Sequence, residues 1–462
     1  LATKDEKGAG PTVKSQNAWL AERKAVRAEL IEVAGEKFDI RTIGKDALAP
    51  VDRAAPDATT PEARTRESER FATPDGADRT PEVARIAELA GLTSVSTNVR
   101  EDEKGKGPAR WQRTIAGAID PSTPYRVTRV ETPRTTSRPP GPFTSTMQQA
   151  ASTRLGFGSQ RTMRAAQALY EGVDIPGEGP VGLITYMRTD STHISGEAIE
   201  MARRYIKSTY GDDYLPDKPN FFTSSNKAAQ EAHEAIRPTS LDYPPQRVKS
   251  ALKADQFRLY QIIWERFVAC QMTPAKWDST SVLIKGGRDP KQELTFKASG
   301  RVLVFDGFYR VAGAPTASDE QTLPALQEKQ ALSPFAAEVQ QKFTSPPPRY
   351  TEASLIKMLE SEGIGRPSTY AEIIQKIQAR KYVELLERRF WASDLGEVVT
   401  DKLVEAFPRI MDIGYTREME AQLDRVEEDH LDWVEMLQRF YSPFKQNLEA
   451  AEENLRHAKA EI

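Results

Sequence analysis

Cysteine is almost absent from this sequence, in which Cys270 is the single thiol among 462 residues. One thiol excludes an intramolecular disulfide framework and any zinc site built from several cysteines of this chain. No apolar run approaches the roughly 20 residues that a membrane-spanning helix needs, and no secretory signal is visible. We therefore expect a soluble, cytoplasmic protein with no zinc and no membrane partner.

Net charge is also small, because 64 basic side chains face 67 acidic ones and leave a formal charge of −3. The overall charge thus gives no indication of nucleic-acid binding, which would have to rest on local basic groups. The apolar content of 39% is sufficient for hydrophobic cores. A chain of this length has room for about two to four domains.

Hydrophobic patterning divides the chain into β-rich and helical regions. Period-two alternation around an Ala-Gly turn predicts a β-hairpin at residues 26–41, and similar alternation returns at 277–284, 293–298 and 302–308. A helical region is therefore predicted to be inserted into a β-rich domain. The expected parts are an unplaced segment 1–25, the β-rich region 26–142, the helical region 143–272, the second β-rich region 273–342 and a helical domain 343–462.

Composition and helix signals predict further features within these parts. Residues 50–110 are poor in large apolar groups and predict a mobile insertion, interrupted by a short helix at 81–90. Glycines around position 157 should split the helical stretch 144–170, and Thr369 with Glu372 has the spacing of a capping box. The other expected helices cover 195–210, 244–270, 351–362, 370–378 and the acidic tail from 416.

A compact group of reactive side chains lies at residues 184–191, Ile-Thr-Tyr-Met-Arg-Thr-Asp-Ser. The apolar run that begins at Val181 predicts a short strand, on which Tyr186 and Arg188 would face the same way with Cα atoms about 7 Å apart. A tyrosine hydroxyl titrates near pH ~10 and needs help to act as a nucleophile. A guanidinium can stabilise the phenolate and can also bind a phosphate oxygen. The ordinary alternative is a cross-strand packing pair.

Four strings in order extend this observation. They are residues 142–150 (Pro-Phe-Thr-Ser-Thr-Met-Gln-Gln-Ala), 184–191, 233–239 (His-Glu-Ala-Ile-Arg-Pro-Thr) and 363–370 (Gly-Ile-Gly-Arg-Pro-Ser-Thr-Tyr). Together they closely resemble the motifs of type IA DNA topoisomerases, the bacterial topoisomerase I family. The resemblance extends from about residue 125 to the C-terminus. It implies a multidomain α+β fold with a toroidal core, in which the tyrosine lies on a helical domain inserted into a β-rich one.

The resemblance also implies an activity. Tyr186 would cut one strand of single-stranded or underwound DNA through a 5′-phosphotyrosine, and strand passage and religation would relax negative supercoils without ATP, in a nucleoid-associated cytoplasmic enzyme. Tyr186 and Arg188 would be catalytic. The implied DNA-contacting residues are Arg188, Asp190, Ser191, His233, Arg237, Arg366 and Thr369. From the loop alone, Arg366 is expected to project between glycines towards a phosphate.

Members of this family also have a TOPRIM domain that supplies a catalytic glutamate and an acidic cluster for Mg²⁺. No equivalent is found in this sequence, so the expected Mg²⁺ lacks its usual ligands here and a TOPRIM-containing chain or segment is an expected partner. Two other hypotheses stay open. The chain could be a non-catalytic module or degenerate paralogue that binds single-stranded DNA, or a tyrosine recombinase, which would form a 3′-phosphotyrosine.

Overall fold

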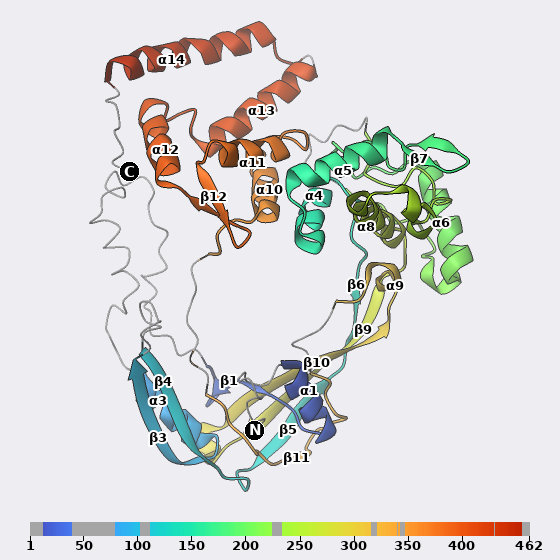
Figure 1. Ribbon diagram of the computed structural model, residues 1–462. Helices are drawn as coiled ribbons and strands as arrows, with labels where there is room; N and C mark the ends of the chain where they lie inside the picture. The colour runs from blue at the N-terminus through green and yellow to red at the C-terminus, as the bar shows by residue number, and fades with distance from the viewer. Residues whose placement is uncertain are drawn as a thin grey trace. The chain divides into compact units, whose positions relative to one another are not determined.

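The computed structural model describes residues 13–38, 79–101, 111–223, 233–315, 321–339, 341, 347–428 and 430–454. The chain divides into two compact units, each with its own hydrophobic core. The first, the sheet unit, comprises residues 1–136, 276–305 and 315–346. The second, the helical unit, comprises 137–275, 306–314 and 347–462. Figure 1 shows their elements in chain order.

The sheet unit is built on one seven-stranded sheet with the strand order β11-β5-β9-β10-β1-β2, and β6 pairs with β9. Its core contains Val127, Val282, Ile284 and Ala298. The bounds are β1 Glu29–Val33, β2 Glu36–Lys37, β5 Tyr125–Glu131, β6 Arg134–Ser137, β9 Ala275–Gly286, β10 Leu294–Phe305 and β11 Ala331–Leu332. Residues 138–274 lie between β6 and β9 in the chain, so the helical region is inserted into the β-rich one, as predicted.

Several local predictions for the sheet unit need correction. The hairpin is confirmed by the pairing of β1 with β2, although residues 39–41 lie outside the described part. The two β-runs predicted at 293–298 and 302–308 are one strand, β10. Gly300 does not make a turn there. A Cβ at this position would lie 2.3 Å from the carbonyl oxygen of Gln321, so glycine permits a close backbone approach instead.

The stretch predicted to be a mobile insertion is in part well structured. Helix α3 (Thr80–Leu89) confirms the short helix, and β3 (Leu92–Glu101) pairs antiparallel with β4 (Trp111–Ile119), which the prediction missed. Thr and Val give β3 a strand propensity that the average composition concealed. Helix α1 (Val13–Glu22) was also missed. Residues 50–78 and 102–110 lie outside the described part.

The described part of the helical unit contains the long helices and two antiparallel strand pairs, β7 with β8 and β12 with β13 (Figure 1). Helix α8 supplies much of its core, with Leu259, Ile263 and Phe267 buried, and it packs beside α5. The bounds are α4 Thr146–Ala150, α5 Ser159–Glu171, β7 Val173–Ile175, β8 Gly179–Val181, α6 Gly196–Tyr210, α7 Pro245–Val248, α8 Ala254–Cys270, α9 Tyr309–Ala312, α10 Glu352–Ser361, α11 Tyr370–Ala379, β12 Val383–Leu386, β13 Arg389–Ala392, α12 Asp394–Ala406, α13 Ile413–Glu427 and α14 Trp433–Asn454.

Most helix predictions in this unit are confirmed, including the break at Gly156, whose φ of +69° suits glycine. A π-helical turn, Ala151–Leu155, joins α4 to that break. The single helix expected at 244–270 is wrong, because α7 ends in a 3-10 turn and Lys253 adopts an extended conformation before α8 begins. Among the described residues, no helix is long and apolar enough to cross a membrane.

Candidate functional site

The Tyr186 segment is extended but is not the strand that the sequence predicted. Strand β8 ends at Val181, and beyond it Ile184 makes only an isolated antiparallel bridge with Pro238. The Thr185 N–H donates to the carbonyl of Arg237 at 2.9 Å. The Thr239 N–H donates to the carbonyl of Leu183 at 3.1 Å, so the bridge has one hydrogen bond on each side and does not extend into a ladder.

Side-chain exposure still alternates along this segment. Tyr186 and Arg188 are exposed, whereas the residue that follows each of them, Met187 and Thr189, is buried. An extended backbone places alternate side chains on opposite faces, so the tyrosine and the arginine share the solvent-facing side. This result agrees with the expected common direction, although the segment lacks a ladder.

Two aromatic side chains flank the Tyr186 ring. The Tyr170 ring lies 5.3 Å away, centroid to centroid, in an edge-to-face arrangement, and the His233 ring lies 6.2 Å away. Among the described residues, none hydrogen-bonds the Tyr186 hydroxyl, and none forms a hydrogen bond or ion pair with the Arg188 guanidinium. The phenol and the guanidinium are therefore both available to a ligand.

Two of the other motif strings hold the Tyr186 segment from below. The Ile236 N–H donates to the carbonyl of Phe143 at 2.8 Å, and the Thr185 hydroxyl donates to the carbonyl of Ala235 at 2.7 Å. Phe143, Ile184 and Ile236 are each almost completely buried. Three sequence-distant strings are thus joined by backbone hydrogen bonds, and each contributes a buried side chain close in sequence to these bonds.

The fourth string joins the same junction through α4 and α10. The Ser145 hydroxyl donates to Glu360 at 2.8 Å, and the Gln149 amide donates to the same carboxylate at 3.1 Å. The Gln148 amide also donates to the carbonyl of Pro367 at 3.4 Å. All four motif strings are therefore connected within the helical unit, and we call this arrangement the motif junction.

Arg366 does not project towards solvent as its loop suggested. One of its nitrogens donates to both carboxylate oxygens of Asp424 at 2.8 and 2.9 Å, and Glu420 lies 3.4 Å from another. Burial alone would lower the pKa of Arg366, but the bond to Asp424 and the charge of Glu420 raise it. Glu420 and Asp424 lie four residues apart on one face of α13, so both carboxylates can reach the same guanidinium.

Thr369 supports this arginine loop. Its hydroxyl accepts a hydrogen bond from the Arg366 N–H at 2.9 Å and donates to the Arg366 carbonyl at 3.1 Å. The predicted capping box with Glu372 is wrong, since Thr369 makes no side-chain cap on α11. The hydroxyl is committed to the loop, which competes for the same donor and acceptor.

Arg237 and Ser191 are also engaged by the protein. Arg237 donates to Glu234 at 3.0 Å, and Glu234 accepts from the Ser195 N–H at 2.8 Å. Burial raises the pKa of Glu234, but the Ser195 hydrogen bonds and the Arg237 charge outweigh it, and the pKa lies below its ordinary value. Ser191 is buried, and its hydroxyl accepts from the His193 N–H at 3.2 Å. Both residues shape the backbone around the tyrosine.

Asp190 contributes to the electrostatic environment of Arg366 and of Tyr370, so it lies on the side of the junction that faces the arginine loop. Among the described residues, no group of three or more His, Cys, Asp or Glu side chains could hold a metal ion. The described acidic side chains therefore do not fit Mg²⁺, which prefers several oxygen ligands in octahedral geometry. The chemistry assigned to this chain below therefore involves only its own side chains.

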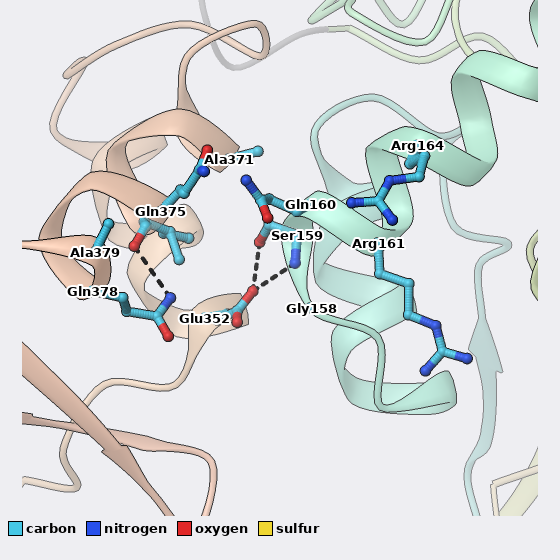
Figure 2. A pocket seen from close by; sticks show the side chains of 11 residues that line it. Gly158, Ser159, Gln160, Arg161, Arg164, Glu352, Ala371, Gln375, Gln378 and Ala379 are labelled. Carbon is cyan, nitrogen blue, oxygen red and sulfur yellow. Dashed lines mark hydrogen bonds between the residues drawn. The ribbon is translucent and has the colours of Figure 1, made fainter.

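A groove with a volume of about 390 Å³ lies beside the N-terminus of α5 and is lined by residues of α5, α10 and α11. Figure 2 shows Glu352 reaching Ser159 across it. That carboxylate accepts from the Ser159 N–H at 2.6 Å and from its hydroxyl at 2.7 Å. Arg161 extends from α5 away from Glu352 (Figure 2). Local sequence signals did not indicate that Glu352 accepts hydrogen bonds at the N-terminus of another helix, α5.

Sequence similarity to known proteins extends over most of the chain. A model of the DNA topoisomerase family matches residues 91–438. The chain therefore belongs to the DNA topoisomerase family, and its mixed, multidomain fold is that of the type IA class. The sequence-based assignment of the family is confirmed.

Two curated relatives and one solved structure illustrate the similarity. DNA topoisomerase 1 of Vibrio cholerae is 47% identical over 331 residues, which are 71% of this chain and 36% of that protein. DNA topoisomerase 1 of Escherichia coli K12 is 45% identical over 357 residues, 77% of this chain and 39% of that protein. Full-length topoisomerase I from Thermotoga maritima matches with a TM-score of 0.63 and 32% identity, covering 76% of this chain and 57% of that one. The chain thus spans less than half the length of these curated relatives.

Proposed function

We propose that this chain provides the DNA-cleaving tyrosine of a type IA DNA topoisomerase. The observation that carries the proposal is that Tyr186 and Arg188 are both exposed on the motif junction and that none of the described residues hydrogen-bonds the hydroxyl or the guanidinium. Membership of the DNA topoisomerase family supports it, and the relatives named above are DNA topoisomerases. The substrate would be single-stranded or underwound DNA.

In the proposed reaction the Tyr186 hydroxyl loses its proton and its oxygen attacks the phosphorus of one phosphodiester. The bond from phosphorus to the 3′-oxygen breaks, and the departing oxygen takes up a proton to leave a 3′-hydroxyl. The 5′-phosphate stays on Tyr186. Arg188 binds a non-bridging oxygen and stabilises the charge that develops there.

Religation is the reverse of cleavage, with the 3′-hydroxyl attacking the phosphotyrosine. Because one phosphoester bond replaces another, resealing the strand needs no ATP. Passage of another strand through the break before resealing would relax negative supercoils. Mg²⁺, which the resemblance implies for the whole protein, would be held by groups other than the described side chains.

The remaining predicted contacts would act around this centre. His233 is exposed beside the Tyr186 ring and can reach the DNA backbone near the break. Arg366 is already paired with acids, so DNA phosphates would compete with Asp424 and Glu420 for it. Arg237, Ser191 and Thr369 would act mainly by holding the backbone of the junction.

The test compares two tyrosine variants for covalent attachment to labelled single-stranded oligonucleotide. Tyr186→Phe should abolish the denaturant-resistant adduct and leave oligonucleotide binding within about twofold, because only the hydroxyl is lost. Tyr441→Phe, at an exposed tyrosine of α14, is the matched control and should leave both unchanged. An adduct that survives in Tyr186→Phe would disprove the proposal. Binding without any adduct in the parent chain would favour the non-catalytic alternative.

A further inference from the structure

We infer that Tyr170 is a positioning residue for the nucleophile, holding the Tyr186 ring in the orientation from which its hydroxyl attacks DNA. This inference rests on the proposed function and assigns a role to a residue outside all four motif strings. Tyr170 lies in the last turn of α5, and its ring meets that of Tyr186 edge to face, with an interplanar angle of 64°.

The orientation of Tyr186 needs such a contact. Among the described residues nothing hydrogen-bonds its hydroxyl, so no polar bond fixes the end of the side chain. A tyrosine ring that is 37% exposed and unbonded at its tip would otherwise rotate among its rotamers. Ring contacts with Tyr170 and His233 are the restraints that the described structure provides.

The backbones behind the two rings are fixed against each other. The Leu183 N–H donates to the carbonyl of Leu169 at 2.8 Å, which ties the nucleophile segment to the end of α5. Gly182 lies so close that a Cβ there would be 2.8 Å from the Tyr170 carbonyl oxygen. With both backbones held close together, the two side chains start from fixed positions from which their rings meet.

The chemistry of Tyr170 favours positioning over other roles. Its ring is 42% exposed, so it can contact the Tyr186 ring at the surface, where DNA would bind. Among the described residues none bonds its hydroxyl, so the ring, rather than the hydroxyl, makes its observed contact. An edge-to-face aromatic pair therefore explains why an apolar ring is kept at the surface beside a nucleophile.

The test separates cleavage from binding in the full chain. Tyr170→Ala should slow single-turnover adduct formation at saturating labelled oligonucleotide by about 2- to 13-fold, the range expected for loss of one aromatic pair. The dissociation constant for the oligonucleotide should change less than twofold. Tyr170→Phe should restore the parental rate, because it keeps the ring. Tyr441→Ala is the control for loss of an exposed tyrosine that makes no ring contact with Tyr186.

Three results would overturn the inference: an unchanged rate in Tyr170→Ala, an equally slow rate in Tyr170→Phe, or weaker binding with an unchanged rate at saturation. The last would mean that Tyr170 stacks on a nucleobase. If Tyr170→Ala fails to fold, Tyr170→Leu replaces it as the test variant. Leucine keeps apolar volume but has no ring, so adduct formation in Tyr170→Leu should be slowed by the same factor.

A second readout does not depend on cleavage. The chain would be labelled with 3-fluorotyrosine, and the ¹⁹F resonance of Tyr186 would be assigned by its loss in Tyr186→Phe. This resonance should shift in Tyr170→Leu and stay near its parental position in Tyr170→Phe. An unshifted resonance in Tyr170→Leu would contradict the inference. Absence of any adduct in the parent chain would instead refute the proposed function, while the fluorine result still decides the ring contact.

Discussion

The motif junction and the C-terminal helices belong to the same helical unit but are built differently. At the junction, Phe143, Ile184 and Ile236 are each almost completely buried beneath an exposed tyrosine. Helix α13 has no buried residue among those described, and α14 keeps Trp433, Leu437 and Tyr441 exposed. Burial is concentrated where a reactive side chain must be held still, whereas α13 contributes mainly the charges that engage Arg366.

This difference in burial predicts a large difference in stability effects. Phe143→Ala should lower the free energy of unfolding by about 3–5 kcal/mol, because it removes a large side chain from a closed core. Leu437→Ala on α14 should change it by less than about 0.5 kcal/mol, as is usual at exposed positions. Urea unfolding followed by circular dichroism measures both. Equal effects would show that the two regions are packed alike.

The hydrogen bonds from Ser159 to Glu352 are expected to stabilise the packing of α5 against α10. Glu352→Ala leaves a largely buried hydroxyl and N–H without their acceptor, which should cost about 1–3 kcal/mol. Glu405→Ala, at an exposed pair with Lys402, should cost less than about 1 kcal/mol. The same unfolding experiment applies. Similar losses in the two variants would mean that the Glu352 contact is no stronger than a surface pair.

Acid should weaken the junction through Glu234. Its pKa is lower in the folded protein than in the unfolded chain, so its contribution to stability is present above the unfolded pKa of about 4.3 and is lost as pH falls through the folded pKa. Glu234→Gln should flatten the fall in stability over that acidic range, measured by unfolding at several pH values. An unchanged pH profile would remove Glu234 from the account.

The smallest effect concerns the acids around Arg366. Asp424→Asn removes a negative charge that competes with phosphate, so oligonucleotide affinity should rise by a few fold and log Kd should depend more steeply on log salt. Arg366→Ala should weaken binding and flatten that dependence. Fluorescence anisotropy at several salt concentrations measures both. Weaker binding in Asp424→Asn would show that Asp424 orients Arg366 for DNA instead of competing for it.

The sequence predicted the elements whose signals are local. The break at Gly156 and the Thr351 cap of α10 follow from backbone preferences that neighbouring residues determine. It also predicted that Tyr186 and Arg188 share one side, because alternation needs only an extended backbone. The continuous strand was not found, because the segment pairs only through one bridge with Pro238, and such a distant partner cannot be predicted from local alternation.

The candidate site shows the same limit more sharply. Resemblance identified the four motif strings, but it could not show that the buried residues Phe143 and Ile236 pair with each other. Arg366 looked available because its loop has no acid, and its partners lie more than fifty residues later on α13. Tyr170 was passed over because an aromatic residue at a helix end is ordinary until its neighbour is known.

The most direct test of the account is to find which side of the broken DNA stays on the protein. Oligonucleotide labelled separately at its 5′ and 3′ ends would be incubated with the parent chain, denatured and separated on a gel. A protein-linked band that carries only the 3′ label is predicted, because Tyr186 holds the 5′-phosphate of the downstream fragment. A protein-linked band that carries only the 5′ label would mean a 3′-phosphotyrosine, as tyrosine recombinases form, and would contradict the proposed chemistry.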